Sequence, residues 1–259
     1  MTRGNADEAE RHHRPAAQVI LTVIPTRDEL DAFVEGCRAQ GHHDEPAVVG
    51  RLPITRFPEL AMAVACGGLG KVQFGIRTQH LLDSGRWRLV VCAGAAGALV
   101  SDLSVGDVVI ATETVEHDIL NRFGAPRLPR FGGSAPILEH CRRALRTDPQ
   151  VRVHYGPVAS GDEDVVDVER RAAIHERTRA LVVAWEGAGG ARASQFSGVE
   201  FVEVRGVTDG ADGLAAHDFA RNVRRAMTSV ALVVTALVRW AGDRHDETRR
   251  GAAQEKGAP

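Results

Sequence analysis

The sequence predicts a single α/β domain built around a largely parallel, buried β-sheet. Short β-branched runs alternate with helical stretches in one unbroken series, and neither an internal repeat nor a linker divides that series. Strands that are covered on both faces read as continuous apolar runs, as these do. The chain has 259 residues and is 44% hydrophobic, which is ample for one large core.

The expected elements follow one another along the chain. The first is a buried strand at Gln18–Ile24, and an amphipathic helix at Arg27–Gln40 comes next. A second helix is expected across Val72–Leu82, and a long one from about His217 to Trp240 closes the fold. The remaining strands are expected at Leu60–Cys66, Leu89–Ala93, Asp107–Thr114, Val151–Val158, Leu181–Trp185 and Phe201–Arg205.

The predicted domain spans residues 18–241. Residues 1–17 and 242–259 are rich in charge, glycine and alanine and show no apolar period, so we expect disordered tails. Residues 119–136 hold three prolines and four glycines or serines, which is typical of a long loop rather than a domain boundary.

Composition argues against several classes of partner. The formal net charge is -2, from 32 basic and 34 acidic residues, so no polyanionic partner such as nucleic acid is indicated. No apolar stretch reaches the ~18 residues of a membrane span, and the N-terminal residues show no apolar signal core. The four cysteines form no CxxC pair, which favours reduced thiols. We therefore expect a soluble cytoplasmic protein without a membrane partner.

Polar or glycine-rich segments stand near the carboxyl ends of five predicted strands. Because ligands bind at that edge of open α/β sheets, these segments are expected to meet at one rim. Carboxylates among them favour a shared site, although Asp, Ser and Thr at such places often only cap the next helix. The segments are Glu29, Gly94–Gly97, Ser160–Asp162, Glu186 and Thr208-Asp209.

Other motifs give weaker signals. The run Gly67–Lys71 is similar to a phosphate loop, but Val72 follows the lysine and Ala65 stands where the first glycine belongs. The triplets His42–Asp44 and Glu116–Asp118 make no compact metal site, since adjacent residues of a strand face opposite ways. The sequence also contains no GxGxxG after the first strand and no Gly-x-Ser-x-Gly elbow.

Six segments in order resemble the methylthioadenosine and S-adenosylhomocysteine nucleosidases, members of the nucleoside phosphorylase superfamily. Together the segments extend over about residues 18–240, so the resemblance covers the predicted domain. It implies a three-layer α/β/α sandwich around a central mixed, largely parallel sheet. The segments are Ala65–Lys71, Ala93–Leu99, Val105–Val109, Val158–Asp162, Trp185–Gly187 and Val204–Asp212.

The resemblance also implies a division of labour among four side chains. Asp209 matches the acid that protonates or hydrogen-bonds N7 of the leaving purine, and Glu186 matches the carboxylate that holds the ribose hydroxyls. Glu29 matches the acid that activates the attacking water, and Arg205 matches an arginine close to that water. The residues expected to contact the base and sugar are Gly97, Val165, Trp185, Glu186 and Phe219.

These residue types suit cleavage of an N-glycosidic bond. The reaction builds positive charge on the sugar and negative charge on the base, so one group must protonate the base while another orients water. A carboxylate near the hydroxyls stabilises the cationic sugar. Three carboxylates meet this requirement without a metal or a cofactor. Relatives are usually oligomers in which a neighbour closes the 5′ pocket, so we expect at least a homodimer.

Several positions depart from the family pattern. Cys92 and Ala95 stand where the phosphorylases have an arginine and a hydroxyl residue for phosphate, which favours water as the nucleophile. Ala184 replaces a glutamate, and Asp164 aligns with the aromatic residue that stacks on adenine. We therefore predict hydrolysis of a purine nucleoside, with a 5′-modified adenosine as the leading substrate. A phosphorylase and a catalytically silent nucleoside-binding module remain the alternatives.

Overall fold

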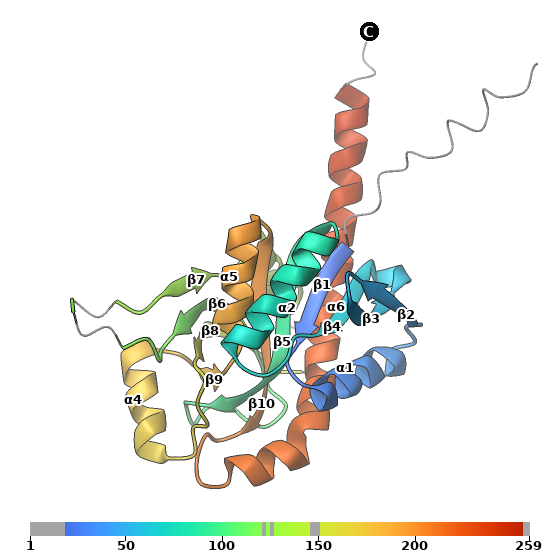
Figure 1. The fold of residues 1–259 in the computed structure, drawn as a ribbon. Helices are drawn as coiled ribbons and strands as arrows, with labels where there is room; N and C mark the ends of the chain where they lie inside the picture. The colour runs from blue at the N-terminus through green and yellow to red at the C-terminus, as the bar shows by residue number, and fades with distance from the viewer. Residues whose placement is uncertain (1–18, 121–122, 125–126, 146–150, 256–259) are drawn as a thin grey trace, which may run out of the picture.

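A ten-stranded mixed β-sheet organises the chain, and helices cover both of its faces (Figure 1). The computed structural model describes residues 19–120, 123–124, 127–145 and 151–255. The predicted N-terminal tail, residues 1–17, lies outside the described residues. The architecture confirms the predicted α/β class and its layered, mixed sheet.

One half of the sheet is open. Strand β1 (Val19–Ile24) lies between β4 (Met62–Cys66) and β5 (Trp87–Ala98) and is parallel to both. The edge is a hairpin of β2 (Glu45–Val49) and β3 (Leu52–Phe57), and β3 pairs with β4 in antiparallel fashion. Parallel pairing therefore belongs to the centre of this half and antiparallel pairing to its edge.

The other half closes on itself. Strand β5 pairs with β10 (Glu200–Asp209), β10 with β6 (Val108–Glu116), β6 with β8 (Val153–Ser160), and β8 with β9 (Val182–Ala184). Strand β9 then pairs with β5 again, at Gly97 and Ala98, so the five strands form a ring. The short β7 (Arg130–Gly132) adds to β6 outside this strand ring.

Helices form a layer on each face of the sheet. Helices α1 (Arg27–Ala39) and α6 (Ala215–Glu255) cover one face, and their apolar side chains share a core with Ile20. Helices α2 (Lys71–Ser84) and α5 (Gly187–Ser197) cover the other face, in a core that includes Leu21. Successive side chains of β1 thus enter opposite cores, as the pleat of a strand dictates.

Three shorter helices complete the fold. A 3₁₀ turn, η2 (Pro58–Leu60), precedes β4. Helix α3 (Ala135–Ala144) reaches α6, where His140 stacks on Trp240 with ring centroids 4.0 Å apart. Helix α4 (Val168–Thr178) begins at Asp167, whose carboxylate accepts a hydrogen bond from the backbone N–H of Arg170. It packs at the end of the strand ring (Figure 1).

Several predicted boundaries are wrong. Strands β5 and β10 continue through Ala98 and Asp209, so the glycine-rich run after Ala93 and the Thr208-Asp209 pair are strand rather than loop. Gly and Ala have low β-propensity, but pairing with two neighbouring strands overrides that preference. Residues 119–136 contain β7 and the first two residues of α3, rather than one long loop. Helix α6 continues to Glu255 instead of ending near Trp240, into the segment predicted to be a tail.

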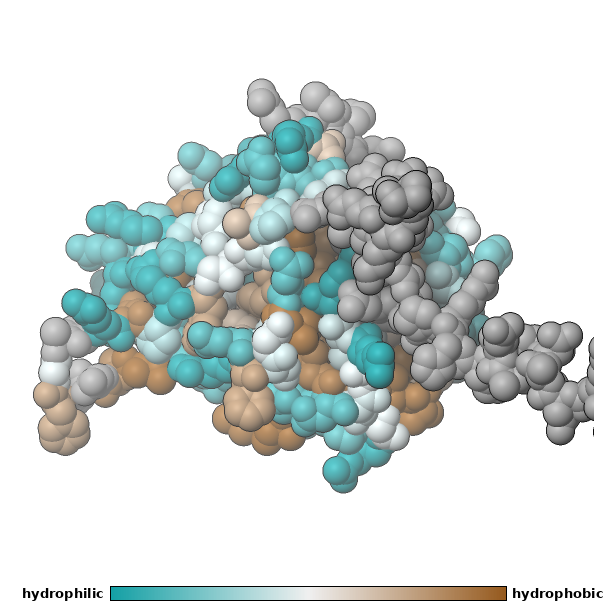
Figure 2. Space-filling view, turned by 90° about the horizontal axis from the view of Figure 1, so that it is seen from above, coloured by the Kyte–Doolittle hydropathy of each residue, from teal (hydrophilic) through white to brown (hydrophobic). Residues whose placement is uncertain are grey.

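Polar and apolar side chains alternate over short distances on the face shown in Figure 2. Large apolar residues that are exposed include Leu69 beside α2 and Val72 and Ile76 within it. Among the described residues, none of the helices combines the length and the apolar character that a membrane span requires.

Candidate active site

Three buried carboxylates line one cavity of about 480 Å³ at the carboxyl ends of β1, β5, β9 and β10. They are Glu29, Glu186 and Asp209, which are 3%, 3% and 9% exposed. The rim predicted from the positions of the strand ends therefore exists, although it is built from longer strands than predicted. The other lining residues used below are Thr26, Leu69, Ala95, Gly97, Asp164, Val165, Trp185, Thr208, Ala211 and Phe219.

Glu29 is fixed by the start of helix α1. Thr26 is the N-cap, and its hydroxyl and backbone N–H donate to Glu29 Oε2 at 2.6 and 3.1 Å in a capping box. The backbone N–H of Ala95, in β5, donates to Glu29 Oε1 at 2.7 Å. Both carboxylate oxygens are thus held by donors on separate elements, which aims a negative group at the cavity. The pattern Thr-x-x-Glu was visible in the sequence, but its capping role was missed.

Glu186 stands at the N-terminus of α5, directly after β9. Its side chain does not cap the helix; instead Oε1 accepts from the backbone N–H of Gly70 at 3.3 Å. Burial raises the pKa of Glu186 to about 7, with the negative charge of Glu29 adding to the rise and Arg205 opposing it. Glu186 therefore gains or loses its proton near neutral pH.

Asp209 ends β10 and is held by two local donors. The Thr208 hydroxyl donates to Oδ2 at 2.7 Å, and the Ala211 backbone N–H donates to Oδ1 at 2.9 Å. Helix α6 is preceded instead by Asp212, whose side chain accepts from Leu214 N, so Asp209 does not cap that helix. Burial raises the pKa of Asp209, as do the charges of Asp212 and Asp218. A raised pKa suits a group that must deliver a proton.

Gly97 leaves space for Asp209. It pairs with Asp209 in the β5–β10 register, and a Cβ atom there would lie 2.8 Å from Asp209 Oδ1. Val165, Trp185 and Phe219 contribute apolar surface to the same cavity. The structure thus places every residue that was predicted to contact the substrate at this cavity.

Arg205 does not line the cavity. The resemblance placed it close to the attacking water, whereas the structure buries it completely behind Glu186. Its Nη1 and Nη2 atoms lie 3.4 Å from Glu186 Oε2, and Nη1 also donates to the Ala95 carbonyl at 3.3 Å. Arg205 can therefore act on the site only through its neighbours.

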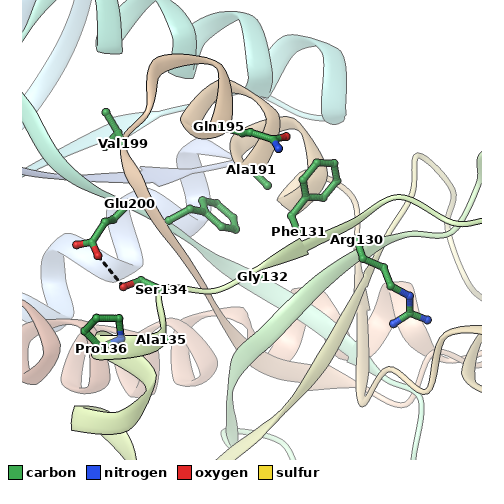
Figure 3. Close-up of a pocket in the computed structure, with 11 residues that line it drawn as sticks. Arg130, Phe131, Gly132, Ser134, Ala135, Pro136, Ala191, Gln195, Val199 and Glu200 are labelled. Atoms are coloured by element: carbon green, nitrogen blue, oxygen red, sulfur yellow. Dashed lines mark hydrogen bonds between the residues drawn. The ribbon is translucent and has the colours of Figure 1, made fainter.

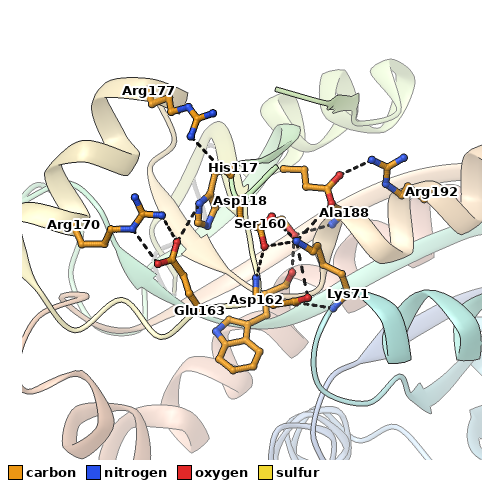
Figure 4. A network of polar contacts seen from close by, with 12 residues as sticks. Lys71, His117, Asp118, Ser160, Asp162, Glu163, Arg170, Arg177, Ala188 and Arg192 are labelled. Atoms are coloured by element: carbon orange, nitrogen blue, oxygen red, sulfur yellow. Dashed lines mark hydrogen bonds and ion pairs between the residues drawn. The ribbon is translucent and has the colours of Figure 1, made fainter. Parts of the chain in front are cut away.

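A cluster of charged side chains connects the start of helix α2 to neighbouring loops at the rim of the cavity (Figure 4). Lys71 Nζ contacts Asp118 and lies 3.5 Å from Glu116 Oε1, while its backbone N–H donates to Asp162 at 2.8 Å. The Asp162 N–H donates to Asp118 Oδ2 at 2.9 Å. The start of α2 is thereby joined to the loop that carries Asp164 and Val165 into the cavity.

The histidines of the triplets His42–Asp44 and Glu116–Asp118 contact carboxylates elsewhere in the protein. His42 Nδ1 lies 3.3 Å from Glu59 Oε1, and His117 lies 3.4 Å from Glu163 Oε1. Burial lowers the pKa of His117. Within the part of the chain that the structure describes, no group of three or more His, Cys, Asp or Glu side chains is arranged to hold a metal ion.

A separate cavity of about 330 Å³ lies between β7, the start of α3 and α5 (Figure 3). Its carboxylate, Glu200, accepts a hydrogen bond from Ser134 Oγ at 3.0 Å, and its guanidinium, on Arg130, pairs with Glu113. Both groups already have partners within the protein and neither is buried, so this cavity is the weaker candidate.

Comparisons with known proteins agree with this geometry. The family model of the phosphorylase superfamily matches residues 19–239. A 5′-methylthioadenosine/S-adenosylhomocysteine nucleosidase of an Exiguobacterium species is 30% identical over 188 residues, 70% of this chain and 81% of its own. The enzyme of that name from Staphylococcus aureus is 31% identical over 185 residues, 68% of this chain and 81% of its own. The Neisseria meningitidis nucleosidase in complex with methylthio-immucillin-A superposes with a TM-score of 0.75 at 28% identity, covering 86% and 99% of the two chains.

Proposed function

This chain belongs to the phosphorylase superfamily, and from that premise we propose that it hydrolyses the N-glycosidic bond of a purine nucleoside. The leading substrates are 5′-modified adenosines such as methylthioadenosine or S-adenosylhomocysteine. The relatives are named as nucleosidases of these two compounds. The observation that carries the proposal is the placement of three buried carboxylates with different partners around one cavity.

Each carboxylate has an environment that suits one task. Asp209, with its raised pKa, donates a proton to the leaving base. Glu29, with both oxygens fixed, accepts a proton from a water on the sugar side. Glu186 accepts hydrogen bonds from the ribose hydroxyls and stabilises the cationic sugar of the transition state. The chemistry uses no metal or cofactor.

Water is the nucleophile in this proposal. Phosphate is normally bound by arginine, lysine or hydroxyl donors, and none of the described residues that line the cavity is a lysine or an arginine. Ala95 lacks a hydroxyl and Cys92 is fully buried. These features favour hydrolysis over phosphorolysis.

We further propose that the chain works as a homodimer or higher oligomer in the cytoplasm, on a small nucleoside rather than on nucleic acid or a membrane. Leu69 lines the cavity and is 54% exposed, and Val72 and Ile76 continue its apolar surface along α2. A neighbouring copy that covers this surface would also close the cavity mouth. Residues 18–241 form the nucleosidase domain in this proposal.

One experiment tests the proposal. A panel of purine nucleosides is incubated with the protein in buffer with and without phosphate, and released base and sugar are separated by chromatography. We expect free base and free sugar at equal rates in both buffers. Sugar 1-phosphate would identify a phosphorylase, and tight nucleoside binding without base release would identify a sensing module.

A further inference from the structure

A buried ion cluster lies behind the cavity wall, at the centre of the strand ring. It consists of Glu203 and Arg205 of β10 together with Glu186, and only Glu186 lines the cavity. Glu203 and Arg205 are both 0% exposed, so neither can touch a substrate. A buried carboxylate is costly unless it is paired and hydrogen-bonded. Glu203 has no role in the proposed function, and its presence calls for a physical reason.

The Arg205 guanidinium is shared unequally between the two carboxylates. Its Nε donates to Glu203 Oε1 at 2.7 Å, the length of a strong charge-assisted hydrogen bond. Nη1 and Nη2 lie 3.4 Å from Glu186 Oε2, a distance at which the contact is weak. Glu203 therefore fixes the position of the guanidinium, and Glu186 receives the weaker part of its attraction.

The surrounding backbone is shaped to accommodate Glu203. Its Oε2 accepts a hydrogen bond from Thr114 Oγ1, on β6, so both oxygens are occupied. A Cβ atom at Gly187 would lie 2.3 Å from both Glu203 oxygens, and one at Gly94 would lie 2.5 Å from Arg205 Nη1. Residues 203 and 205 are two apart in β10, so their side chains share one face of the strand.

We infer that Glu203 is a positioning residue for sugar recognition, which holds Arg205 so that Glu186 keeps its carboxylate free for the ribose hydroxyls. The inference rests on the proposed function of Glu186. Among the described residues, Arg205 forms ion pairs with Glu203 and Glu186. If Glu203 lost its charge, Glu186 would be the remaining charged partner of these two. A short bidentate ion pair would then form and occupy the oxygens that bind the sugar.

The groups around Glu186 give the inference a second consequence. Glu186 faces Arg205 from β10, Glu29 from α1 and the backbone N–H of Gly70 before α2. Arg205 lowers the pKa of Glu186, and Glu203 competes for that same cation. Removing the charge of Glu203 should therefore lower the pKa of Glu186 and extend activity to lower pH.

The test uses Glu203→Gln, which keeps the size of the side chain. Initial rates are measured with a purine riboside and its 3′-deoxy analogue, which lacks one hydroxyl that Glu186 would bind. At pH 8.5, we expect the ratio of kcat/KM between the two substrates to fall about tenfold in the variant. In the pH profile of kcat/KM for the riboside, the acidic limb should move about one pH unit lower. The inference is overturned if the variant melts like the unchanged protein and both the kcat/KM ratio and the acidic limb stay unchanged.

Two further variants keep the test decisive. Thr114→Val removes the other contact of Glu203 without changing charge and should lower the ratio about threefold, which covers the case in which Glu203→Gln does not fold. An unchanged ratio in that variant, with Glu203→Gln unfolded, also counts against the inference. Glu200→Gln, on the same strand but outside the cluster, is the matched control and should leave the ratio unchanged. Failure of the unchanged protein to cleave any nucleoside overturns the proposed function itself, and the inference with it.

Discussion

The two ends of the cavity present the same functional group in different surroundings. At the end that we assign to the base, Asp209 is held only by neutral donors, and the charges that act on it come from other carboxylates. At the end that we assign to the sugar, Glu186 lies against the Arg205 guanidinium and Glu29 is fixed by three N–H or O–H donors.

The difference determines which proton state each end favours. Burial and nearby negative charge favour a protonated Asp209, which can donate. At the other end Arg205 opposes the effect of burial on Glu186, whose pKa of about 7 leaves its carboxylate ionised above neutral pH and able to stabilise a cationic sugar. The two ends therefore suit different tasks, and substitutions at the two ends should have different effects.

The largest effect is expected from Asp209→Asn. Asparagine keeps the size of the side chain; its Oδ1 can accept the Ala211 hydrogen bond and its Nδ2 can donate to the Thr208 hydroxyl, but it has no acidic proton to transfer. Turnover should fall about 100-fold or more, with a near-normal melting temperature. Substrates whose base leaves easily without protonation should lose less. Asp212→Asn is the control, and early melting of Asp209→Asn with retained activity per folded molecule would show a structural residue.

The next effect concerns pH and Glu186. Because the pKa of Glu186 is raised to about 7, its ionised form prevails above that pH and its neutral form below it. A protonated Glu186 accepts hydrogen bonds poorly, so kcat/KM should fall about tenfold from pH 8 to pH 6. In Glu186→Gln this limb should be absent. A limb that persists unchanged in the variant would assign the titration to another group.

A smaller effect is expected from Thr26→Val, also at the sugar end. The variant removes one hydroxyl donor from Glu29 but leaves the backbone donors of Thr26 and Ala95. Turnover should fall about fivefold to tenfold, and loss of the cap should cost about 1 kcal/mol of stability. Thr26→Ser retains the hydroxyl and should behave like the unchanged protein. Equal losses in both variants would point to packing instead of the hydrogen bond.

The smallest effect is expected at the base end, from Asp164→Phe. Asp164 lines the cavity at the position that the resemblance gives to a base-stacking aromatic. A carboxylate cannot stack on adenine, so methylthioadenosine should be a mediocre substrate of the unchanged protein. Restoring an aromatic ring should lower its KM about fivefold, near the low end of measured stacking contributions. Asp164→Leu controls for added apolar surface, and equal gains in both variants would exclude stacking.

Much of the fold could be predicted because apolar periodicity is a local property of the sequence. Strand β1 and helices α1 and α2 were placed to within about two residues in this way. The hairpin of β2 and β3 and helices α3, α4 and α5 were missed. Helix α5 is rich in glycine and alanine, and it is helical because it packs between α2 and the sheet. Local preference could not reveal that packing.

The candidate site, like the fold, could be predicted only in part. The resemblance identified Glu29, Glu186 and Asp209, and simple strand-end reasoning predicted that such groups would meet. The burial of Arg205 and its tie to Glu203 could not be predicted, because they depend on the pairing of β10 with both β5 and β6. That pairing joins segments about 90–110 residues apart.

The strand ring has a consequence for how the molecule opens. An edge strand such as β2 can separate from its neighbour alone, and its amide protons should exchange with solvent through small, frequent fluctuations. A strand of the ring has a partner on each side, so releasing β10 requires two ladders to break at once. The amides of Val204, Arg205 and Gly206, which lie in both ladders, should therefore exchange only when the whole domain unfolds. The most slowly exchanging protons of the protein should thus lie in β10 around the buried Arg205.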